Sequence, residues 1–301
     1  MNFIINFIKG IFVGVANIIP GVSGGTMAVS FGIYDKILSS ISNLFKDFKN
    51  SVKALLPIFV GMAAGIVGFT FIIPYCLKTQ PFITSMAFTG LIIGGLPAIA
   101  KSLKETISKE KPSYLSSIIV FIFMLTIALA MPFINANSES GVLLNPDGKT
   151  IITVFFMGII AAATMVIPGV SGSLILMILG YYFGIISAVK DFITALKDLD
   201  FAKMFNLALI LAPFALGCIL GIFFISKLIA WLLKVFPTQT FSGILGLIIV
   251  SPVSIFYKVN EEYSMTNTSI AKILIGVILL VLCIIVTLYI GNLDTNKEEN
   301  N

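Results

Sequence analysis

The sequence predicts an all-α polytopic membrane protein, in which about ten apolar segments form two inverted-topology repeats, with broken or re-entrant helices at a PGVSG motif in each repeat. Three observations lead to this prediction. The 301 residues are 58% hydrophobic with a mean hydropathy of +1.07, which is more apolar side chain than a soluble domain of this length can bury. Several apolar runs reach about 20 residues, the length that spans a bilayer as a helix. The motif at Ile19–Gly25 recurs 148 residues later, at Ile167–Ser173, which indicates an internal repeat.

The apolar segments follow one another in two groups of five, separated by the polar stretch Asn135–Thr150. Each is expected to be helical, because in lipid every backbone polar group must be satisfied internally. The first group is predicted at Phe3–Pro20, Gly21–Ile41, Val52–Leu77, Phe82–Ala100 and Tyr114–Ile134. The second group is predicted at Ile151–Pro168, Gly169–Val189, Met204–Leu233, Phe241–Tyr257 and Ile270–Ile290.

The repeat continues beyond the two motifs. At the same offset Gly32 and Tyr34 correspond to Gly180 and Tyr182, and further on the offset becomes 156 residues and stays constant. We therefore expect four parts: repeat one over residues 1–134, an extracytoplasmic linker over 135–150, repeat two over 151–291 and a polar C-terminal tail over 292–301. The longer offset pairs Pro57, Gly61, Gly65, Lys78, Pro81 and Gly90 with Pro213, Gly217, Gly221, Lys234, Pro237 and Gly246.

The loop charges indicate how the repeats are oriented. The loops Ser42–Val52 and Lys101–Ser113 are rich in lysine, whereas their counterparts Asp191–Lys203 and Lys258–Ser269 carry more acidic residues than lysines. Because lysine-rich loops stay on the cytoplasmic side, both termini are expected inside and the linker outside. Five crossings in each half then give the repeats opposite orientations. Inverted repeats are typical of transporters, whose sites lie where the repeats meet.

The charged and sulfur-containing residues exclude several classes of function. The basic residues are all lysine, with no arginine and no histidine, so arginine clamps and histidine-based acid–base or metal chemistry are ruled out. Cys76, Cys218 and Cys283 lie far apart in apolar runs and are expected to be small buried hydrophobes. We expect no cofactor, no metal and no nucleic-acid partner.

The two PGVSG motifs place a helix breaker with small and hydroxylated residues where the hydropathy predicts membrane. Proline lacks an N–H and ends a helix, and the glycines let the chain turn and expose backbone amides. Ser23 is a good N-cap for a following helix. The predicted result is a broken helix whose N-terminus presents free N–H groups, an anion site that needs no arginine. The candidate anion-binding residues are Pro20, Gly21, Ser23, Gly24, Gly25, Thr26, Pro168, Gly169, Ser171, Gly172 and Ser173.

The segment lengths allow re-entrant geometry at the first motif. Ser23–Leu38 would give a helix of about 24 Å and Gly10–Ile19 one of about 15 Å, both short of a comfortable span. A re-entrant hairpin and two full spans stay open as alternatives. The small-residue runs Gly61–Gly65 and Gly217–Gly221 are expected instead to let helices pack closely.

Four further polar residues are accessory candidates. Lys78 and Lys234 correspond by the repeat, are expected near opposite faces of the membrane, and could each capture an anionic head group. Snorkelling to the interface is the favoured interpretation of both. Asn17 precedes the first motif, and Asp35 is expected to end the helix that the motif begins. Both have apolar counterparts in the second repeat, so the first motif is expected to carry more of any polar chemistry.

The residues around both motifs carry a family resemblance. Gly14–Tyr34, GVANIIPGVSGGTMAVSFGIY, and Met165–Tyr182, MVIPGVSGSLILMILGYY, resemble the bacterial polyprenyl-phosphate translocases of the PopT type, over nearly the whole chain. The resemblance implies a lipid-carrier transporter, not an enzyme, that flips undecaprenyl phosphate from the outer to the inner leaflet of the bacterial cytoplasmic membrane. There the carrier is reused for peptidoglycan and other cell-envelope polymers. The implied partners are undecaprenyl phosphate, whose phosphate the motif residues would bind, and the lipid bilayer.

The residues leave other functions open. Broken helices with serine, glycine and proline also suit a small-anion channel or exchanger. Undecaprenyl-diphosphate phosphatases are similar in having inverted repeats and a Pro-Gly-x-Ser motif, but they add an arginine and paired glutamates, and this chain has no arginine. A coupling ion, either a proton or sodium, and assembly into a homo-oligomer are also left open by the sequence.

Overall fold

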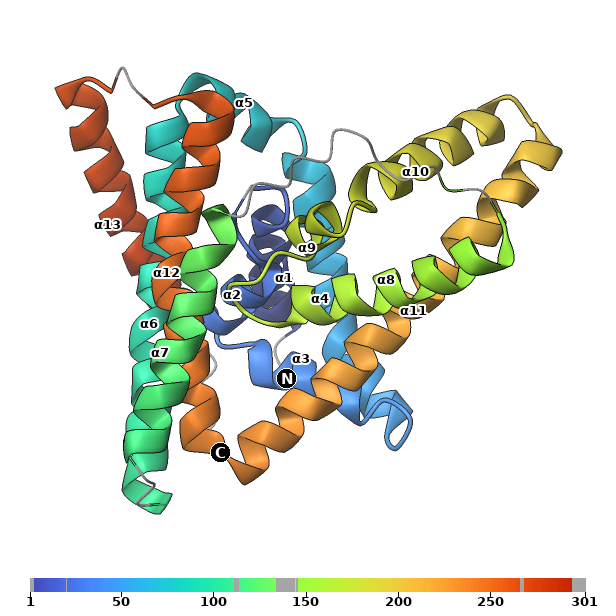
Figure 1. Ribbon diagram of the computed structural model, residues 1–301. Helices are drawn as coiled ribbons and strands as arrows, with labels where there is room; N and C mark the ends of the chain where they lie inside the picture. Colours follow the sequence, from blue (N-terminus) through green and yellow to red (C-terminus); the bar gives the residue numbers. More distant parts are fainter. Residues whose placement is uncertain are drawn as a thin grey trace. The chain divides into compact units, whose positions relative to one another are not determined.

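The computed structural model describes residues 3–19, 21–110, 114–133, 144, 146–265 and 268–293, and within these ranges it is helical, without a strand (Figure 1). The helices of the first half are α1 (Phe3–Ala16), α2 (Gly24–Ser30), α3 (Tyr34–Ser42), α4 (Phe48–Phe69), α5 (Ile72–Thr79), α6 (Pro81–Glu110), α7 (Tyr114–Ala130) and the short 3₁₀ helix η1 (Met131–Phe133). Those of the second half are α8 (Gly148–Val166), α9 (Gly172–Ile178), α10 (Tyr182–Lys197), α11 (Phe201–Val235), α12 (Pro237–Tyr263) and α13 (Ile270–Asn292).

Most of these helices are suited to a lipid bilayer. Within the described residues, 7 helices are long and apolar enough to cross a membrane: α4, α6, α7, α8, α11, α12 and α13. The pair α9 and α10 also has the length and composition of a span, but it is bent by 110° at its break. The chain is therefore a multi-pass, all-helical membrane protein, as its composition predicts.

The helices break at the two motifs, as predicted, and then break again. After the first motif α2 is followed by α3, and after the second motif α9 is followed by α10. Gly32 and Gly180 supply these second breaks with φ angles of 67° and 79°, which other residues rarely adopt. The predicted continuous helix of about 24 Å from Ser23 to Leu38 is therefore wrong, because the chain turns at Gly32.

The described contacts divide the chain into two compact units. Unit 1 comprises Met1–Phe133, Ile167–Val170 and Lys227–Asn301, and unit 2 comprises Ile134–Val166 and Ser171–Ser226. The first half of the sequence therefore lies in unit 1, whereas the second half contributes to both units. The division passes through the second PGVSG motif, between Val170 and Ser171.

In unit 1 the long helices α6, α7, α12 and α13 form a bundle (Figure 1). α6 packs along α13 and α12, and α7 packs along α12. Gly90 of α6 lies against the Leu280 carbonyl of α13, and its counterpart Gly246 of α12 lies against the Phe121 carbonyl of α7. A Cβ on either glycine would overlap that oxygen, so glycine is needed for the close approach. The last helix of each half of the sequence thus packs on the other half.

Glycines also bring helices together at a second pair of corresponding contacts. In unit 1, Gly61 of α4 lies against the Phe7 carbonyl of α1, where an added Cβ would overlap the oxygen. In unit 2, its counterpart Gly217 of α11 lies in the same way against the Phe155 carbonyl of α8. Small residues permit such close backbone approach in membrane helices. The packing role predicted for the two small-residue runs is confirmed.

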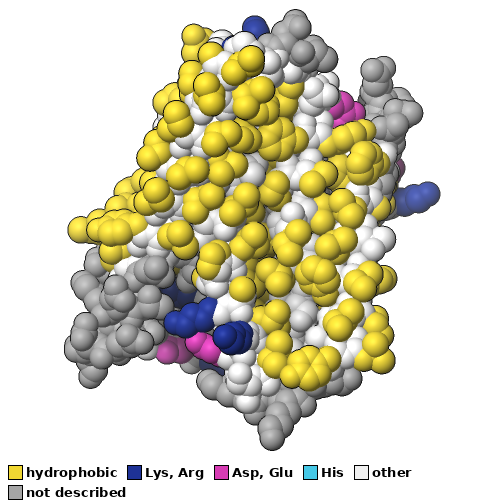
Figure 2. Space-filling model, turned by 90° about the vertical axis from the view of Figure 1, so that its left-hand side faces the viewer, with side chains coloured by type: hydrophobic (Ala, Val, Ile, Leu, Met, Phe, Trp, Pro, Cys, Tyr) yellow, Lys and Arg dark blue, Asp and Glu magenta, His cyan; other side chains and the backbone are white. Residues whose placement is uncertain are grey.

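The outer surface of the bundle is apolar. Figure 2 shows a face that hydrophobic side chains cover for the most part, with lysine and acidic side chains towards its edges. On α13, the side chains of Leu274, Ile278 and Leu282 are 61%, 59% and 50% exposed. Such a surface would be unfavourable in water and is suited to contact with lipid tails.

Candidate functional site

The first motif turns the chain directly against α12 in unit 1. Gly21 has a φ of 80°, and a Cβ at this position would lie 2.8 Å from the Ser254 carbonyl oxygen. Both the backbone conformation and the space therefore require glycine. The candidate residue Pro20, one position earlier, lies outside the described residues.

Ser23 holds a buried hydroxyl that no group of the described chain satisfies. The residue occupies the N-cap position of α2, but its side chain makes no capping hydrogen bond. It is 6% exposed, and its Oγ has no hydrogen-bond partner within the described part of the chain. The predicted N-cap position of this serine is therefore confirmed, but its side chain does not make the capping hydrogen bond. Because a buried hydroxyl without a partner is unfavourable, this group is suited to bind a ligand that enters the unit.

Asn17 lies over the start of α2. A Cβ at Gly24 would lie 2.7 Å from the Asn17 Oδ1 atom, and the Asn17 Nδ2 atom donates to the Val13 carbonyl at 3.1 Å. The second motif has the same local geometry with an apolar side chain, since a Cβ at Gly172 would lie 2.6 Å from the Met165 Cγ atom. The amide of Asn17 is thus a polar group that the first motif has and the second lacks.

The two motifs are hydrogen-bonded to each other within unit 1. The Gly169 N–H donates to the Thr26 Oγ1 atom at 2.7 Å, and Thr26 is fully buried. Gly169 has a φ of 78°, and a Cβ there would lie 2.9 Å from the Leu247 carbonyl oxygen of α12. The amide of Gly169 is therefore occupied by Thr26, not free as predicted. Gly21, Thr26 and Gly169 together form a junction of both motifs beside α12.

The remaining part of the second motif belongs to unit 2. Ser171 is the N-cap of α9, and its Oγ accepts a hydrogen bond of 3.5 Å from the Leu174 N–H. The Oγ atoms of Ser171 and Ser173 lie 2.9 Å apart. Both serines are N-cap residues, but only Ser171 makes the side-chain capping hydrogen bond. Of the other candidates, Gly25, Pro168 and Gly172 are buried.

The short helices after the motifs change the expected source of positive charge. α2 and α9 have 7 residues each, about 10 Å, so few peptide dipoles are aligned behind either N-terminus. Their first-turn N–H groups still have no intrahelical partner. Donors at the first motif are therefore individual N–H and O–H groups, not the end of a long helix.

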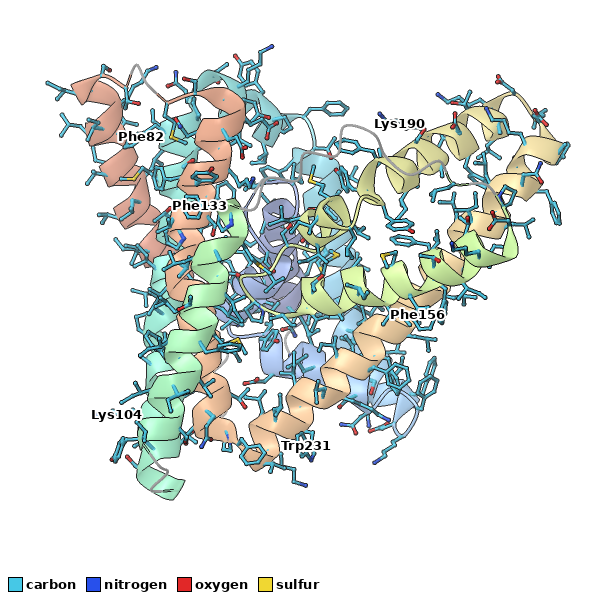
Figure 3. The ribbon with its side chains drawn as sticks, in the orientation of Figure 1. Phe82, Lys104, Phe133, Phe156, Lys190 and Trp231 are labelled. Carbon is cyan, nitrogen blue, oxygen red and sulfur yellow. The ribbon has the colours of Figure 1, made fainter. Side chains whose placement is uncertain are left out.

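The accessory candidates lie at the surface. Asp35 is in the first turn of α3, so the prediction that it ends the helix of the first motif is wrong; Gly32 separates the two helices. Lys78 and Lys234 are exposed and lie in the last turns of α5 and α11. Within unit 1, α5 lies at one end of the bundle and Trp231, one turn before Lys234, lies at the other (Figures 1 and 3).

A buried polar pair in α1 was not identified from the sequence. Lys9 and Asn6 are both fully buried, one turn apart. The only signal available was a lysine and an asparagine within an otherwise apolar run, FIINFIKGIFVG, and position alone did not distinguish Lys9 from a lysine that reaches the interface.

Comparisons with known proteins agree on one family. A family model described as "Undecaprenyl phosphate translocase-like" matches residues 13–273. A protein of Vibrio cholerae serotype O1 named "Polyprenyl-phosphate transporter" is 31% identical over an alignment of 263 residues that covers 83% of this chain and 76% of that protein. A protein of Staphylococcus aureus with the same name is 29% identical over 295 residues, 98% of each chain. No solved structure matches.

Proposed function

The chain belongs to the undecaprenyl phosphate translocase-like family, and on this basis we propose that it flips undecaprenyl phosphate from the outer to the inner leaflet of the bacterial cytoplasmic membrane. The returned carrier is then reused for peptidoglycan and other envelope polymers. Both termini face the cytoplasm in this proposal, because the lysine-rich loops of the first half lie on that side. The protein acts as a transporter and leaves the phosphate ester intact.

The unpartnered hydroxyl of Ser23 is the observation that carries this proposal. It lies three residues before Thr26, which accepts a hydrogen bond from Gly169 of the other motif, so both motifs contribute groups to this part of unit 1. A phosphate oxygen is a strong acceptor and would satisfy the Ser23 O–H. The Gly24 and Gly25 N–H groups, in the first turn of α2, supply further donors. Ser171 and Ser173 follow Gly169 closely in sequence and are the corresponding donors of the second motif.

The substrate has two parts that need different surroundings. The phosphate needs hydrogen-bond donors away from lipid, and the polyprenyl tail needs an apolar environment throughout the movement. The buried donors of the first motif suit the former, and the exposed apolar surface of helices such as α13 suits the latter. We assign the movement to the two inverted halves, which expose the site to one leaflet at a time. The antiparallel α6 and α12, corresponding helices of the two halves, support that orientation (Figure 1).

The test measures undecaprenyl phosphate on the outer surface of cells depleted of all such translocases and then given this gene. A lipopeptide that binds the carrier from outside reports the amount. Wild type should clear the outer pool, and Ser23→Ala combined with Ser171→Ala should not, because it removes a donor from each motif. Ser108→Ala is the matched control, since its hydroxyl is exposed and bonds only to the Lys104 carbonyl of its own helix.

Each outcome decides between functions. Clearance by wild type and the control but not by the double variant, at equal expression, supports both the function and the site. An unchanged outer pool with correctly inserted wild type contradicts lipid recycling. Chloride flux in liposomes then tests the small-anion channel or exchanger, because neutral N–H and O–H donors suit chloride as well as phosphate.

A further inference from the structure

Lys9 is the most completely buried charged residue in the part of the chain that the structure describes. Among the side chains that the structure describes, it is the only charged one in the buried core, with an exposed fraction of 0%. It lies in α1, within an apolar sequence. A buried ammonium group needs polar partners, and ionisable residues inside membrane segments usually mark substrate or ion pathways.

Snorkelling does not account for Lys9. A lysine near the end of a membrane helix usually extends its side chain to the interface, and Lys78 and Lys234 are exposed in that way. Lys9 is not exposed at all. Its charge is therefore held inside the protein rather than returned to water.

Asn6 adds a second, independent indication of a ligand. It is also 0% exposed, and neither its Nδ2 nor its Oδ1 atom has a hydrogen-bond partner among the residues that the structure describes. Residues three apart lie on the same face of a helix, so the amide and the ammonium group project from one face of α1. Together they offer N–H donors of an amide and an ammonium group, which suit an anion with several acceptor oxygens.

The buried face of α1 leads from this pair to the first motif. Asn6, Lys9, Val13 and Ala16 are buried at the three-and-four spacing of one helix face. Asn17, whose amide donates to the Val13 carbonyl, follows at the end of that face. Lys9 and Asn17 are eight residues apart, about 12 Å along the helix. The pair is therefore a separate position from the motif, displaced towards the N-terminus of the chain.

We infer that Lys9 and Asn6 form a second binding site, or station, for the phosphate group of a prenyl phosphate. The phosphate group occupies this station between the first motif and the side of the membrane on which the N-terminus lies. This inference rests on the proposed function. The motif residues are uncharged, whereas a phosphate monoester carries a charge of about −1.5 to −2 at neutral pH. If no cation lay near the motif, the negative charge of a phosphate group that leaves it would enter the apolar interior without a compensating charge. The Lys9 ammonium group supplies this positive charge.

The test compares binding of radiolabelled farnesyl phosphate with that of farnesol to the purified full-length protein. Wild type should prefer the phosphate. Lys9→Met, which keeps the length of the side chain but removes the charge, should weaken farnesyl phosphate binding about tenfold or more and leave farnesol binding unchanged. Lys9→Arg should restore most of the preference. Lys104→Met is the control, because Lys104 is exposed on α6 (Figure 3).

Additional variants and a competitor distinguish failure of the station from failure of the proposed function. Asn6→Asp keeps the size of the side chain and places a negative charge beside Lys9, so it should also lose the phosphate preference, even where Lys9→Met does not fold. If wild type transports lipid and Asn6→Asp or Lys9→Met keeps the wild-type preference, the station is refuted while the proposed function stands. If wild type does not prefer farnesyl phosphate to farnesol, both are refuted. If inorganic phosphate competes as well as farnesyl phosphate, the site binds free anion and the assignment to a prenyl phosphate is wrong.

Discussion

The hydrogen bond between the two motifs can be removed without changing the shape of either. Thr26→Val replaces the Oγ1 atom that accepts the Gly169 N–H at 2.7 Å with a methyl group of similar size. Thr26→Ser keeps the hydroxyl. Thr126→Val is the matched control, because the Thr126 hydroxyl is exposed and bonds to the Ile122 carbonyl of its own helix.

The free-energy cost of losing this hydrogen bond follows from the burial of Thr26 and Gly169. A buried donor that loses its acceptor costs about 1–3 kcal/mol, and because Gly169 is only partly buried, we expect about 1 kcal/mol. That difference corresponds to roughly fivefold faster opening of the junction. Amide hydrogen exchange of the peptide that covers residues 167–170 measures it directly. Thr26→Val should exchange about fivefold faster than wild type, and Thr26→Ser and Thr126→Val should match wild type.

The reasoning is refuted if residues 167–170 of Thr26→Val exchange at the wild-type rate in a correctly folded protein. It is also refuted if Thr126→Val accelerates exchange there as much as Thr26→Val does. Either result would mean that the packing of Gly21 and Gly169 on α12 holds the junction without help from Thr26.

Two further predictions concern helix packing and helix capping. Gly61→Ala should lower thermal stability in detergent by the equivalent of about 1–3 kcal/mol, because its Cβ would overlap the Phe7 carbonyl. Gly68→Ala in the same helix is the control, because its Cβ would meet no described atom within 4 Å, and it should keep wild-type stability. Equal stability of the two variants would contradict the close contact of α1 and α4. Asp147 accepts a hydrogen bond of 2.7 Å from the Thr150 N–H at the start of α8, and this bond lowers the pKa of the carboxyl. A lowered pKa in the folded state means that the stabilisation is present above the unfolded pKa of about 3.9 and is lost as the pH falls through the folded pKa. Exchange of the Thr150 amide should therefore be slower in wild type than in Asp147→Ala near neutral pH, and a difference that persists unchanged at the lowest pH would count against the carboxylate as the cap.

The predictable parts of the fold are those that local chemistry decides. The apolar runs, the breaks at both motifs and the close-packing glycines follow from hydropathy and from the special backbone of proline and glycine. The second break at Gly32 was missed because apolar residues continue on both sides of it. The recurrence of a glycine at the corresponding position, Gly180, was a signal that Gly32 adopts a positive φ.

The less predictable parts of the site depend on tertiary contacts. Ser23 and Ser171 are both N-cap residues, yet the buried Ser23 hydroxyl has no partner among the described residues, whereas the Ser171 hydroxyl accepts from the Leu174 N–H. The bond from Gly169 to Thr26 joins residues 143 positions apart and has no local signature. Lys9 resembles any lysine near an apolar segment until the fold shows that it is buried.

The crossed packing of the last helices determines what half of the protein could do alone. α7 belongs to the first half of the sequence but packs on α12, and α13 belongs to the second half but packs on α6. A gene for the first half alone would encode a chain whose final helix lacks its native partner. That helix could regain an equivalent surface from the complementary fragment expressed as a separate chain, so the two fragments are suited to reconstitution as a split protein.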